Sequence, residues 1–536
     1  MKFSAAKSKL PSLKNALLAI VSAILLIGAF PDFDFRFLAW FALVPLFFAI
    51  EREKESIVKS FVLGWIFGII FFFGSCWWLT FAPITYGGVP SFIAYLLFFG
   101  VTLVTGFFPA IFGALFSLLL KRFGSYAILS APFLWTATEF LRFWMTGNNW
   151  NAIGYSQAFY NGNTGILKYA AIGGIYLVGF ICVFFSSCYA VALISRTKRN
   201  FWFAVIPQLI ILISLFYSPD YYGNLNFNVN KSDSATIIAV QPNVPMSGLK
   251  YGELENLRTR HVELAENALQ KIKEQRINDE GQSTIIIFPE SPMNFEYESD
   301  REFQSFLKDF TARNNASVLF NSAQPNTRGT NLYNSAVMVN ALGEKIAQYD
   351  KIHLVPFGET VPLPDAIAQF VPTMVGNFEV GNNYNLFPVG DAKGGVMICF
   401  ESHFPELSRE FVRGGADVLI EMTNDGYLGK TPVLRQHLAN AVFRAVETNR
   451  PVVRVTNTGI TAYINERGEV LDALDDYTQG ARVWTISKSD GEQTFYVKYG
   501  DWFAWLCSIA SLALLFWSFR KRENSRSNSQ ETQKNL

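Results

Sequence analysis

The first 218 residues alternate long apolar runs with short polar loops. A helix of about 20 apolar residues spans the roughly 30 Å hydrocarbon core of a bilayer, and several runs approach that length. We therefore predict seven membrane-spanning helices, with approximate cores at residues 17–29, 37–50, 61–81, 93–119, 127–143, 167–194 and 201–217. An eighth apolar run covers residues 502–519. Because further spans follow the first at once, we expect a retained helix there rather than a cleaved signal peptide.

The apolar pattern changes after a polar linker at residues 219–234. Short β-branched runs then alternate with helical stretches, which is typical of a globular α/β domain. We predict strands at residues 236–240, 284–288, 318–322, 335–339, 395–399, 418–422 and 452–456, and helices at residues 253–273, 302–313, 405–414 and 432–449. The expected organisation is a membrane domain at residues 1–218, the linker, an α/β domain at 235–490, a membrane helix at 500–520 and a polar cytoplasmic tail at 521–536.

The basic residues indicate how the predicted helices are oriented. Short loops that carry Lys and Arg stay in the cytoplasm. Lys or Arg occurs in both terminal tails, at residues 51–59, 121–122 and 196–199, whereas residues 82–91 and 146–163 carry neither. We therefore predict that both termini are cytoplasmic and that the α/β domain lies on the outer face of the membrane.

Composition narrows the class of protein further. Of the residues, 50% are hydrophobic and 16% are aromatic, which is too apolar for an ordinary water-soluble enzyme of 536 residues. The formal net charge of +1 gives no reason to expect nucleic acid or another polyanion as a partner. Four of the five cysteines lie in apolar runs, where a disulfide framework has no purpose, and Cys399 stands alone in the α/β domain.

Two charged side chains occupy unusual positions in the α/β domain. Glu290 follows Pro289, which ends the predicted strand at residues 284–288. Burial at such a strand end raises the pKa of a carboxyl group toward the range of a general base. Lys351 lies among apolar and aromatic residues, a setting that suits an ammonium group held to stabilise an oxyanion. The ordinary alternative for each is a solvated loop or surface charge.

Cys399 ends another predicted strand and is followed by Phe400 and Glu401. A thiol at a strand-to-helix turn, with a cationic neighbour to favour the thiolate, has the geometry of a nucleophile. In that geometry we expect the backbone N–H of Phe400 to donate to an oxyanion. The alternative for this cysteine is the role of a small buried hydrophobe.

Histidine offers a competing mechanism, because a Cys–His pair is the obvious other way to activate a thiol. His403 lies four residues after Cys399, and His353 lies two residues after Lys351. We expect structural or hydrogen-bonding roles for both, since a glutamate already supplies a base. The remaining histidines, His261 and His437, fall in predicted helices, and no spacing resembles a zinc site.

The order and setting of Glu290, Lys351 and Cys399 resemble those of the nitrilase superfamily, whose sandwich fold carries a Glu-Lys-Cys triad and forms a thioester. Two motifs narrow the resemblance: HLVPFGETVP at residues 353–362 and TNDG at residues 423–426. Together with the predicted helices on both sides of the α/β domain, they resemble the apolipoprotein N-acyltransferase family over nearly the whole chain. Membrane-side segments at residues 87–90, 135–142 and 147–157 resemble the same family.

This resemblance implies a multi-pass α-helical membrane domain of about eight helices plus an extramembrane nitrilase-like αββα sandwich. It makes Cys399 the nucleophile, Glu290 the general base and Lys351 the group that stabilises the tetrahedral intermediate. It also implies that Glu359 orients the lysine or assists proton transfer. The supporting or substrate-binding positions that it implies are Glu359, Glu401, Phe400, Tyr251 and Trp150.

Several positions depart from the commoner family pattern while leaving the triad intact. Phe288 and Tyr251 stand where Trp is frequent, and Phe400 stands where Tyr follows the nucleophile. Residues 425–428 read DGYL where DAWF is more usual, and Gly426 is the one departure that loses side-chain bulk. These changes affect the expected contacts of a lid and any role for a hydroxyl group at position 400.

The reaction implied by the resemblance is a ping-pong acyl transfer. Cys399 takes an acyl chain from the sn-1 position of a phospholipid, and the α-amine of an S-diacylglyceryl-cysteine at the N-terminus of an apolipoprotein accepts it. The expected location is the bacterial inner (cytoplasmic) membrane, with the α/β domain on the periplasmic side. No soluble cofactor, metal or nucleic acid is implied.

Two other functions stay open at this point. A membrane-tethered nitrilase-type amidase would use the same triad to hydrolyse a small amide without lipid, whereas a non-enzymatic receptor or transporter would not need an intact triad.

Glu139 and Arg142 lie three residues apart in the fifth predicted span and are expected to share one helical face. The aromatic loops at residues 77–90 and 146–160 fit either a lipid-facing rim or an interfacial belt, and residues 363–382 are a candidate lid.

Overall fold

The computed structural model of the chain describes residues 9–159, 165–195, 233–246, 251–275, 283–290, 296–326, 331–361 and 376–534, together with residues 202, 205, 206, 209 and 329. The side chains of residues 195, 233–234, 251–257, 275 and 521–534 lie outside this description. The linker predicted at residues 219–234 and the candidate lid at residues 363–382 also fall largely outside it. The same holds for most of the seventh predicted span, at residues 201–217.

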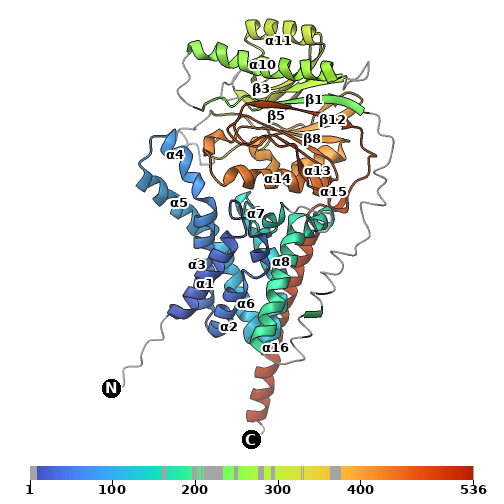
Figure 1. Cartoon of the computed structure of the whole chain (residues 1–536). Coiled ribbons are helices and arrows are strands. Elements are labelled where there is room, and N and C mark those ends of the chain that lie inside the picture. Colours follow the sequence, from blue (N-terminus) through green and yellow to red (C-terminus); the bar gives the residue numbers. More distant parts are fainter. Residues whose placement is uncertain are drawn as a thin grey trace.

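Two six-stranded sheets stack face to face in the α/β domain (Figure 1). Their strand orders are β12-β1-β2-β3-β4-β5 and β11-β10-β9-β8-β7-β6. Helices α10 (Tyr251–Gln275) and α11 (Arg301–Asn314) cover the outer face of the first sheet. Helices α13 (Pro405–Arg413) and α14 (Val433–Thr448) cover the outer face of the second. The expected αββα sandwich is therefore confirmed.

The predicted strands are all present, and edge strands are what the sequence patterns missed. The seven that were predicted are β1 (Asp233–Gln241), β2 (Ser283–Ile287), β3 (Ser317–Pro325), β4 (Leu332–Val339), β7 (Ala392–Ile398), β8 (Val418–Thr423) and β9 (Val452–Thr456). The others are β5 (Lys345–Asp350), β6 (Leu386–Val389), β10 (Ala462–Ile464), β11 (Val470–Leu471) and β12 (Gly480–Ser487). All of these except β10 form the edges of the two sheets, where strands are short or polar and the apolar signal is weak.

Strand β1 illustrates how the two layers of apolar core arise. Successive side chains of a strand point to opposite faces of the sheet. Ile237 and Ala239 therefore face the core between the sheets, whereas Ile238 and Val240 pack beneath α10 and α11. A run without polar alternation is thus what a strand covered on both faces requires.

The helical region consists of helices α1 to α8 and α16. Their bounds are α1 (Leu13–Ile27), α2 (Val44–Glu53), α3 (Ile57–Cys76), α4 (Phe81–Thr85), α5 (Ser91–Thr105), α6 (Phe107–Phe123), α7 (Ala131–Thr146), α8 (Ala170–Ser195) and α16 (Trp502–Lys534). Short 3₁₀ turns join them: η1 (Arg36–Trp40), η2 (Trp77–Thr80), η3 (Gly124–Ser130), η4 (Ile153–Gln157) and η5 (Ile166–Tyr169).

Length and hydropathy mark four of the described segments as able to cross a membrane. They are Ile57–Thr85, Ser91–Thr146, Ile166–Ile194 and Trp502–Arg520, and Leu13–Ile27 is apolar but shorter. The predicted count of about eight membrane helices is therefore not confirmed. One reason is that Ser91–Thr146 is counted once although it contains α5, α6 and α7.

Two predicted spans are not single continuous helices. Within residues 37–50, the helix α2 begins only at Val44, and its 10 residues rise about 15 Å, half the thickness of the hydrocarbon core. The run at residues 93–119 is divided at Gly106 into α5 and α6. Pro109 lies in the first turn of α6, where a residue without a backbone N–H is tolerated but cannot continue the preceding helix.

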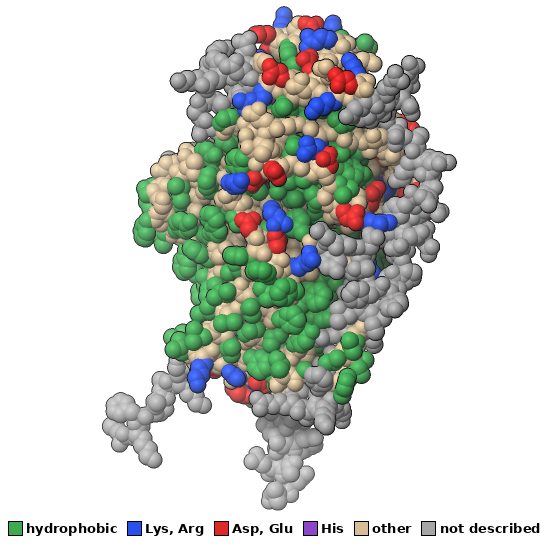
Figure 2. All heavy atoms as spheres, viewed as in Figure 1, with side chains coloured by type: hydrophobic (Ala, Val, Ile, Leu, Met, Phe, Trp, Pro, Cys, Tyr) green, Lys and Arg blue, Asp and Glu red, His purple; other side chains and the backbone are tan. Residues whose placement is uncertain are grey.

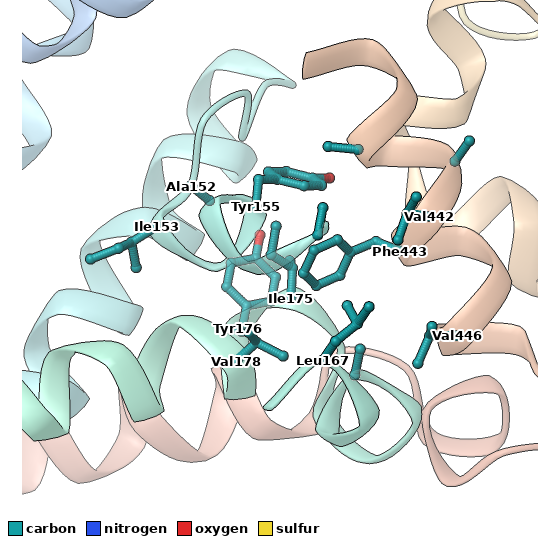
Figure 3. Close-up of a cluster of buried hydrophobic side chains, with 14 of the residues drawn as sticks. Ala152, Ile153, Tyr155, Leu167, Ile175, Tyr176, Val178, Val442, Phe443 and Val446 are labelled. Atoms are coloured by element: carbon teal, nitrogen blue, oxygen red, sulfur yellow. The ribbon is translucent and has the colours of Figure 1, made fainter. Parts of the chain in front are cut away.

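Helix α14 joins the sandwich to the helical region. Every residue from position 436 to 448 is buried, although many are polar, because α14 is covered by the second sheet on one side and by the helical region on the other. Figure 3 shows Val442, Phe443 and Val446 of α14 facing Tyr155, Leu167 and Ile175. The rings of Tyr155 and Phe443 lie 5.1 Å apart. The two parts of the chain therefore share one continuous apolar core.

Surface side chains divide clearly by type (Figure 2). Hydrophobic side chains cover the flank of the helical region, whereas charged side chains concentrate over the sandwich and again at the opposite end. Large apolar side chains exposed on this region include Phe92, Leu97, Val104, Ile509 and Phe516. An apolar band of this extent is the kind of surface that contacts lipid.

Helices α3 and α6 pack so closely that their contact requires glycine. A Cβ atom added to Gly64 would lie 2.1 Å from the carbonyl oxygen of Pro109, and one added to Gly113 would lie 2.3 Å from that of Ser60. Small residues allow helix backbones to approach closely where no hydrophobic driving force exists between helices.

We predict that Gly64→Ala destabilises the protein by about 1–3 kcal/mol, because the added methyl group forces α3 away from α6. Thermal unfolding in detergent measures the effect. Gly100→Ala is the matched control: a Cβ atom at Gly100 in α5 meets nothing within 4 Å, so unfolding should be unchanged or slightly delayed. Equal stability of the two variants would contradict the close contact.

Candidate active site

The site lies where the two sheets present neighbouring strand ends. Glu290 follows β2 and Lys351 follows β5, both in the first sheet, whereas Cys399 follows β7 in the second sheet. The structure thus brings together three residues, of which the first and the last, Glu290 and Cys399, are 109 positions apart in the sequence. Of the three, Lys351 has no exposed surface, and only 12% of the Glu290 side chain is exposed.

Cys399 occupies a sharp turn between β7 and the 3₁₀ turn η6 (Cys399–His403). Its φ angle of 54° lies in the left-handed region, which is unfavourable for a residue with a side chain and recurs at strained functional turns. The thiol is half-buried and interacts with the side chains of Glu290 and Thr423. The turn therefore aims the sulfur atom at the predicted base.

Two carboxylates converge on Lys351. Its Nζ atom lies 2.9 Å from Oε1 of Glu359 and 3.6 Å from Oε1 of Glu290. The side-chain amide of Asn334 links the carboxylates by donating to Glu290 at 3.1 Å and to Glu359 at 2.7 Å. The backbone N–H of Val355 donates to the second oxygen of Glu359 at 2.8 Å. Glu359 thus lies where it can orient the lysine.

The pKa values of this cluster follow from burial and from the charges within it. Burial by itself lowers the pKa of Lys351, but Glu359 and Glu290 outweigh it, so the net pKa is raised and the group stays an ammonium. Burial raises the pKa of Glu290; Lys351 opposes this effect, and the nearby Glu359 adds to it. The carboxyl that faces the thiol is therefore a stronger base than an ordinary glutamate.

The Cys399 thiol has its pKa raised well above the usual value. Burial is the largest cause, Glu290 adds to it, and Lys351 opposes it. The cationic neighbour expected from the sequence is present, but it does not outweigh burial. Cys399 is therefore a neutral thiol at ordinary pH and needs a base to remove its proton.

Glu401 ties the ends of the two sheets together. One carboxylate oxygen accepts hydrogen bonds from the Tyr349 hydroxyl at 2.7 Å and from the backbone N–H groups of Ile352 at 2.7 Å and His353 at 3.0 Å. The other oxygen accepts from the backbone N–H of Ile398 at 2.8 Å. Its contacts therefore fix the segment that follows Lys351 against the residue that precedes Cys399.

A second buried network supports the turn at Cys399. The His437 ring places Nδ1 2.7 Å from Asp425 and Nε2 3.1 Å from the carbonyl oxygen of Cys399. Arg454 completes the network through ion pairs with Asp425 at 2.7 Å and with Glu421 at 2.5 Å. This histidine therefore contacts the backbone of the turn.

The charge state of His437 suits that role. Burial and Arg454 lower its pKa, but Asp425 and Glu421 outweigh them and raise it to about 9. Burial raises the pKa of Asp425, and Arg454 and His437 outweigh it and lower the value to about 2. An imidazolium can donate from both ring nitrogens, so it donates to the carboxylate and to the Cys399 carbonyl together.

Trp150 brings the helical region to the site. Its ring lies 6.2 Å from that of Phe400 at an interplanar angle of 18°, and 5.1 Å from that of His403. Arg142 donates to the Trp150 carbonyl at 2.9 Å, and the Glu139 carboxylate accepts from the backbone of the same loop. The two ionisable residues singled out in the fifth predicted span therefore hold this loop.

Other predicted positions have simpler surroundings. His353 stacks on Phe404 with ring centroids 3.8 Å apart, and His403 accepts from the backbone N–H of Asn149 at 3.2 Å. Tyr251 begins α10, but its side chain lies outside the described part of the chain. At Gly426 an added Cβ would lie 2.5 Å from Cγ of Met246, so a neighbouring side chain fills the space that this departure leaves.

Sequence reasoning missed Asn334 and the network around His437. In the sequence, the signal for Asn334 was a polar amide within the apolar strand β4. The structure shows that this amide is buried. The signal for His437 was the accumulation of polar residues in a helix buried on every side. Neither signal indicates a function until the partners are known.

Comparison with known proteins shows which families this chain resembles. Residues 22–188 match the model of the apolipoprotein N-acyltransferase N-terminal domain, and residues 237–496 match that of carbon-nitrogen hydrolases. An apolipoprotein N-acyltransferase of Geobacter metallireducens is 29% identical over 524 residues, which cover 95% of this chain and 96% of the relative. The crystal structure of Saccharomyces cerevisiae Nit3, of the nitrilase superfamily, has 18% identity and a TM-score of 0.38 and matches 50% of this chain and 96% of that one.

A second relative extends the match along the chain. The apolipoprotein N-acyltransferase of Thermotoga maritima is 30% identical over 531 residues, which cover 96% of this chain and 95% of the relative. The similarity therefore includes both the helical region and the sandwich. This chain belongs to the apolipoprotein N-acyltransferase family.

Proposed function

We propose that this protein transfers an acyl chain from the sn-1 position of a phospholipid to the α-amine of an S-diacylglyceryl-cysteine at the N-terminus of an apolipoprotein. The observation that carries the proposal is the meeting of Glu290, Lys351 and Cys399 in one buried site whose wall includes a loop of the helical region. The membership of the family supports the same reaction.

In the first half-reaction Cys399 is the nucleophile. Its sulfur attacks the ester carbonyl while Glu290 takes the thiol proton, as the neutral state of the thiol requires. The Lys351 ammonium and the backbone N–H of Phe400 stabilise the oxyanion. The ester C–O bond then breaks, Glu290 returns the proton to the leaving oxygen, and lysophospholipid departs from the thioester.

In the second half-reaction the α-amine of the apolipoprotein attacks the thioester. Glu290 accepts a proton from the attacking amine, the C–S bond breaks, and Glu290 returns the proton to the departing sulfur, so that the thiol is regenerated as the amide product leaves. Because the same base serves both halves, it must lie between the sulfur and either incoming group. Its contacts with Cys399 and Lys351 support that position.

The supporting residues keep these groups in register. Glu359 orients Lys351 through its 2.9 Å contact, and Glu401 fixes the turn by accepting from Ile398. Phe400, the residue after Cys399, stacks on Trp150, and we propose that this aromatic pair contacts the acyl chain.

The proposed location is the bacterial inner membrane. Seven helices within residues 1–218 and an eighth at 500–520 would cross it, with a linker at 219–234, a catalytic domain at 235–490 facing the periplasm and a tail at 521–536 in the cytoplasm. The apolar flank of the helical region and the position of the basic loops support this arrangement.

A membrane-tethered amidase would use the same triad without lipid. The contact of Trp150 with Phe400 favours the transferase, because it builds part of the site from a loop that leaves the apolar helices. An enzyme for small soluble amides has no need of such a wall.

We predict that Cys399→Ala abolishes N-acylation of a diacylglyceryl-cysteine peptide in detergent micelles containing phospholipid. Mass spectrometry of the peptide, with the donor labelled at sn-1 or at sn-2, measures the transfer and its origin. Cys507→Ala, which alters a buried cysteine of α16, is the control and should retain activity. Transfer that persists without Cys399, or turnover of small amides alone, would contradict the proposal.

We predict that acylation of the enzyme rises with pH through the raised pKa of Glu290, because only the carboxylate can accept the thiol proton. Glu290→Gln should remove this dependence and lower the rate about 10²–10⁴-fold. Stopped reactions across a pH series measure both effects. Glu410→Gln, at a partly exposed ion pair on α13, should keep the wild-type profile. An unchanged pH dependence in Glu290→Gln would rule out the assigned base.

A further inference from the structure

Gln436 is the point where one side chain of the sandwich binds several loops of the helical region. It lies on α14, is 4% exposed, and uses both ends of its amide. The oxygen accepts from Nε1 of Trp78 at 3.1 Å, from Nε1 of Trp150 at 3.0 Å and from the amide of Asn151 at 3.4 Å. The nitrogen donates to backbone carbonyls at 3.0 and 3.4 Å, those of Ser75 and Pro31.

These partners come from three separate parts of the helical region. Pro31 follows α1, Ser75 and Trp78 lie at the end of α3 and in η2, and Trp150 and Asn151 precede η4. A buried amide costs free energy unless its donors and acceptors are satisfied, and the partners of the Gln436 amide described above come from these three loops. Its hydrogen bonds therefore depend on how these loops are arranged.

Two short paths connect Gln436 to the nucleophile turn. The first runs through the next residue in the chain, His437, whose Nε2 lies 3.1 Å from the carbonyl oxygen of Cys399. The second runs through Trp150, whose ring stacks on Phe400. The turn between these two supports has a left-handed residue at its start, a conformation that persists only where its surroundings fix it.

We propose that Gln436 is a positioning residue that couples the loops at Pro31, Trp78 and Trp150 to the Cys399 turn. When the loops are hydrogen-bonded to Gln436, the His437 and Trp150 supports hold the sulfur in its reactive position. When these bonds are lost, Trp150 no longer supports the turn, and His437 alone holds it. The inference rests on the proposed function in one respect, the identity of Cys399 as the nucleophile.

Other contacts of α14 keep the sandwich attached when Gln436 is changed. Arg435 pairs with Asp34 and lies over the Phe159 ring at 4.8 Å. Farther along the helix, Glu447 accepts from the backbone N–H of Ile175 at 3.1 Å. The apolar contacts in Figure 3 add to these. A substitution at Gln436 therefore changes the position of the turn more than the attachment of the two parts.

The test is Gln436→Leu, which keeps the size of the side chain and removes its hydrogen bonds. The first measurement is the rate at which iodoacetamide alkylates Cys399, followed by peptide mass spectrometry, which needs no acyl donor. The second is the rate of acyl-enzyme formation over a range of phospholipid concentrations. We expect altered alkylation of Cys399 and about tenfold slower acylation at saturation, with half-saturation changed by less than about twofold.

Gln304→Leu is the matched control. This glutamine also donates to a backbone carbonyl, that of Tyr297 at 2.6 Å, but it lies on α11 on the far side of the sandwich. It should leave both rates unchanged. If Gln436→Leu fails to fold, Trp78→Phe and Trp150→Phe each remove one donor to Gln436 and provide the same test.

A double variant decides whether the residues act as a unit. With coupling through Gln436, Trp78→Phe should slow acylation in the wild type but have little further effect in Gln436→Leu. Wild-type alkylation and acylation in folded Gln436→Leu, or independent effects of the two substitutions, would overturn the inference. If wild-type protein is not acylated by phospholipid, but Gln436→Leu still changes the alkylation of Cys399, only the proposed function would be contradicted.

Discussion

The site is organised around a charge that cannot be exposed to water. Lys351 has no exposed surface, and an isolated ammonium group in such surroundings would be too costly to keep. It is retained because Glu359 and Glu290 approach from different segments and Asn334 links them. The sandwich must therefore bring the ends of β2, β4 and β5 together, and this requirement fixes the position of Glu290.

The same charge cluster sets the chemistry of the cysteine. Burial raises the pKa of the Cys399 thiol and Glu290 adds to this effect, whereas Lys351 opposes it without outweighing burial, so the thiol is neutral unless a base removes its proton. Glu401 and His437 hold the turn from two directions, one through Ile398 and the other through the Cys399 carbonyl.

The helical region is part of the site as well as its support. Trp150 forms a wall beside the nucleophile turn, and α14 is enclosed between this region and the second sheet. The polar residues of α14 divide into those that face the turn, such as His437, and those that bind loops, such as Gln436. Neighbouring residues of one helix therefore contact the loops of the helical region and the turn at Cys399.

The sequence predicted the parts of the molecule whose signal is local. The central strands and the long helices of the sandwich have clear apolar periods, and Glu290, Lys351 and Cys399 each end a strand or follow one. Edge strands such as β12 and the interruption at Gly106 depend on pairing and packing that no window of sequence contains. Asn334 and His437 could not be assigned either, since their importance arises from partners distant in the chain.

The most direct test of the account is a single turnover of purified protein with phospholipid, followed by intact-mass spectrometry and peptide mapping. The account predicts one acyl adduct on Cys399, sensitive to hydroxylamine, which a diacylglyceryl-cysteine peptide discharges with formation of an N-acyl amide. Folded protein that forms no adduct, or an adduct that water removes faster than the peptide amine, would contradict a thioester acyltransferase.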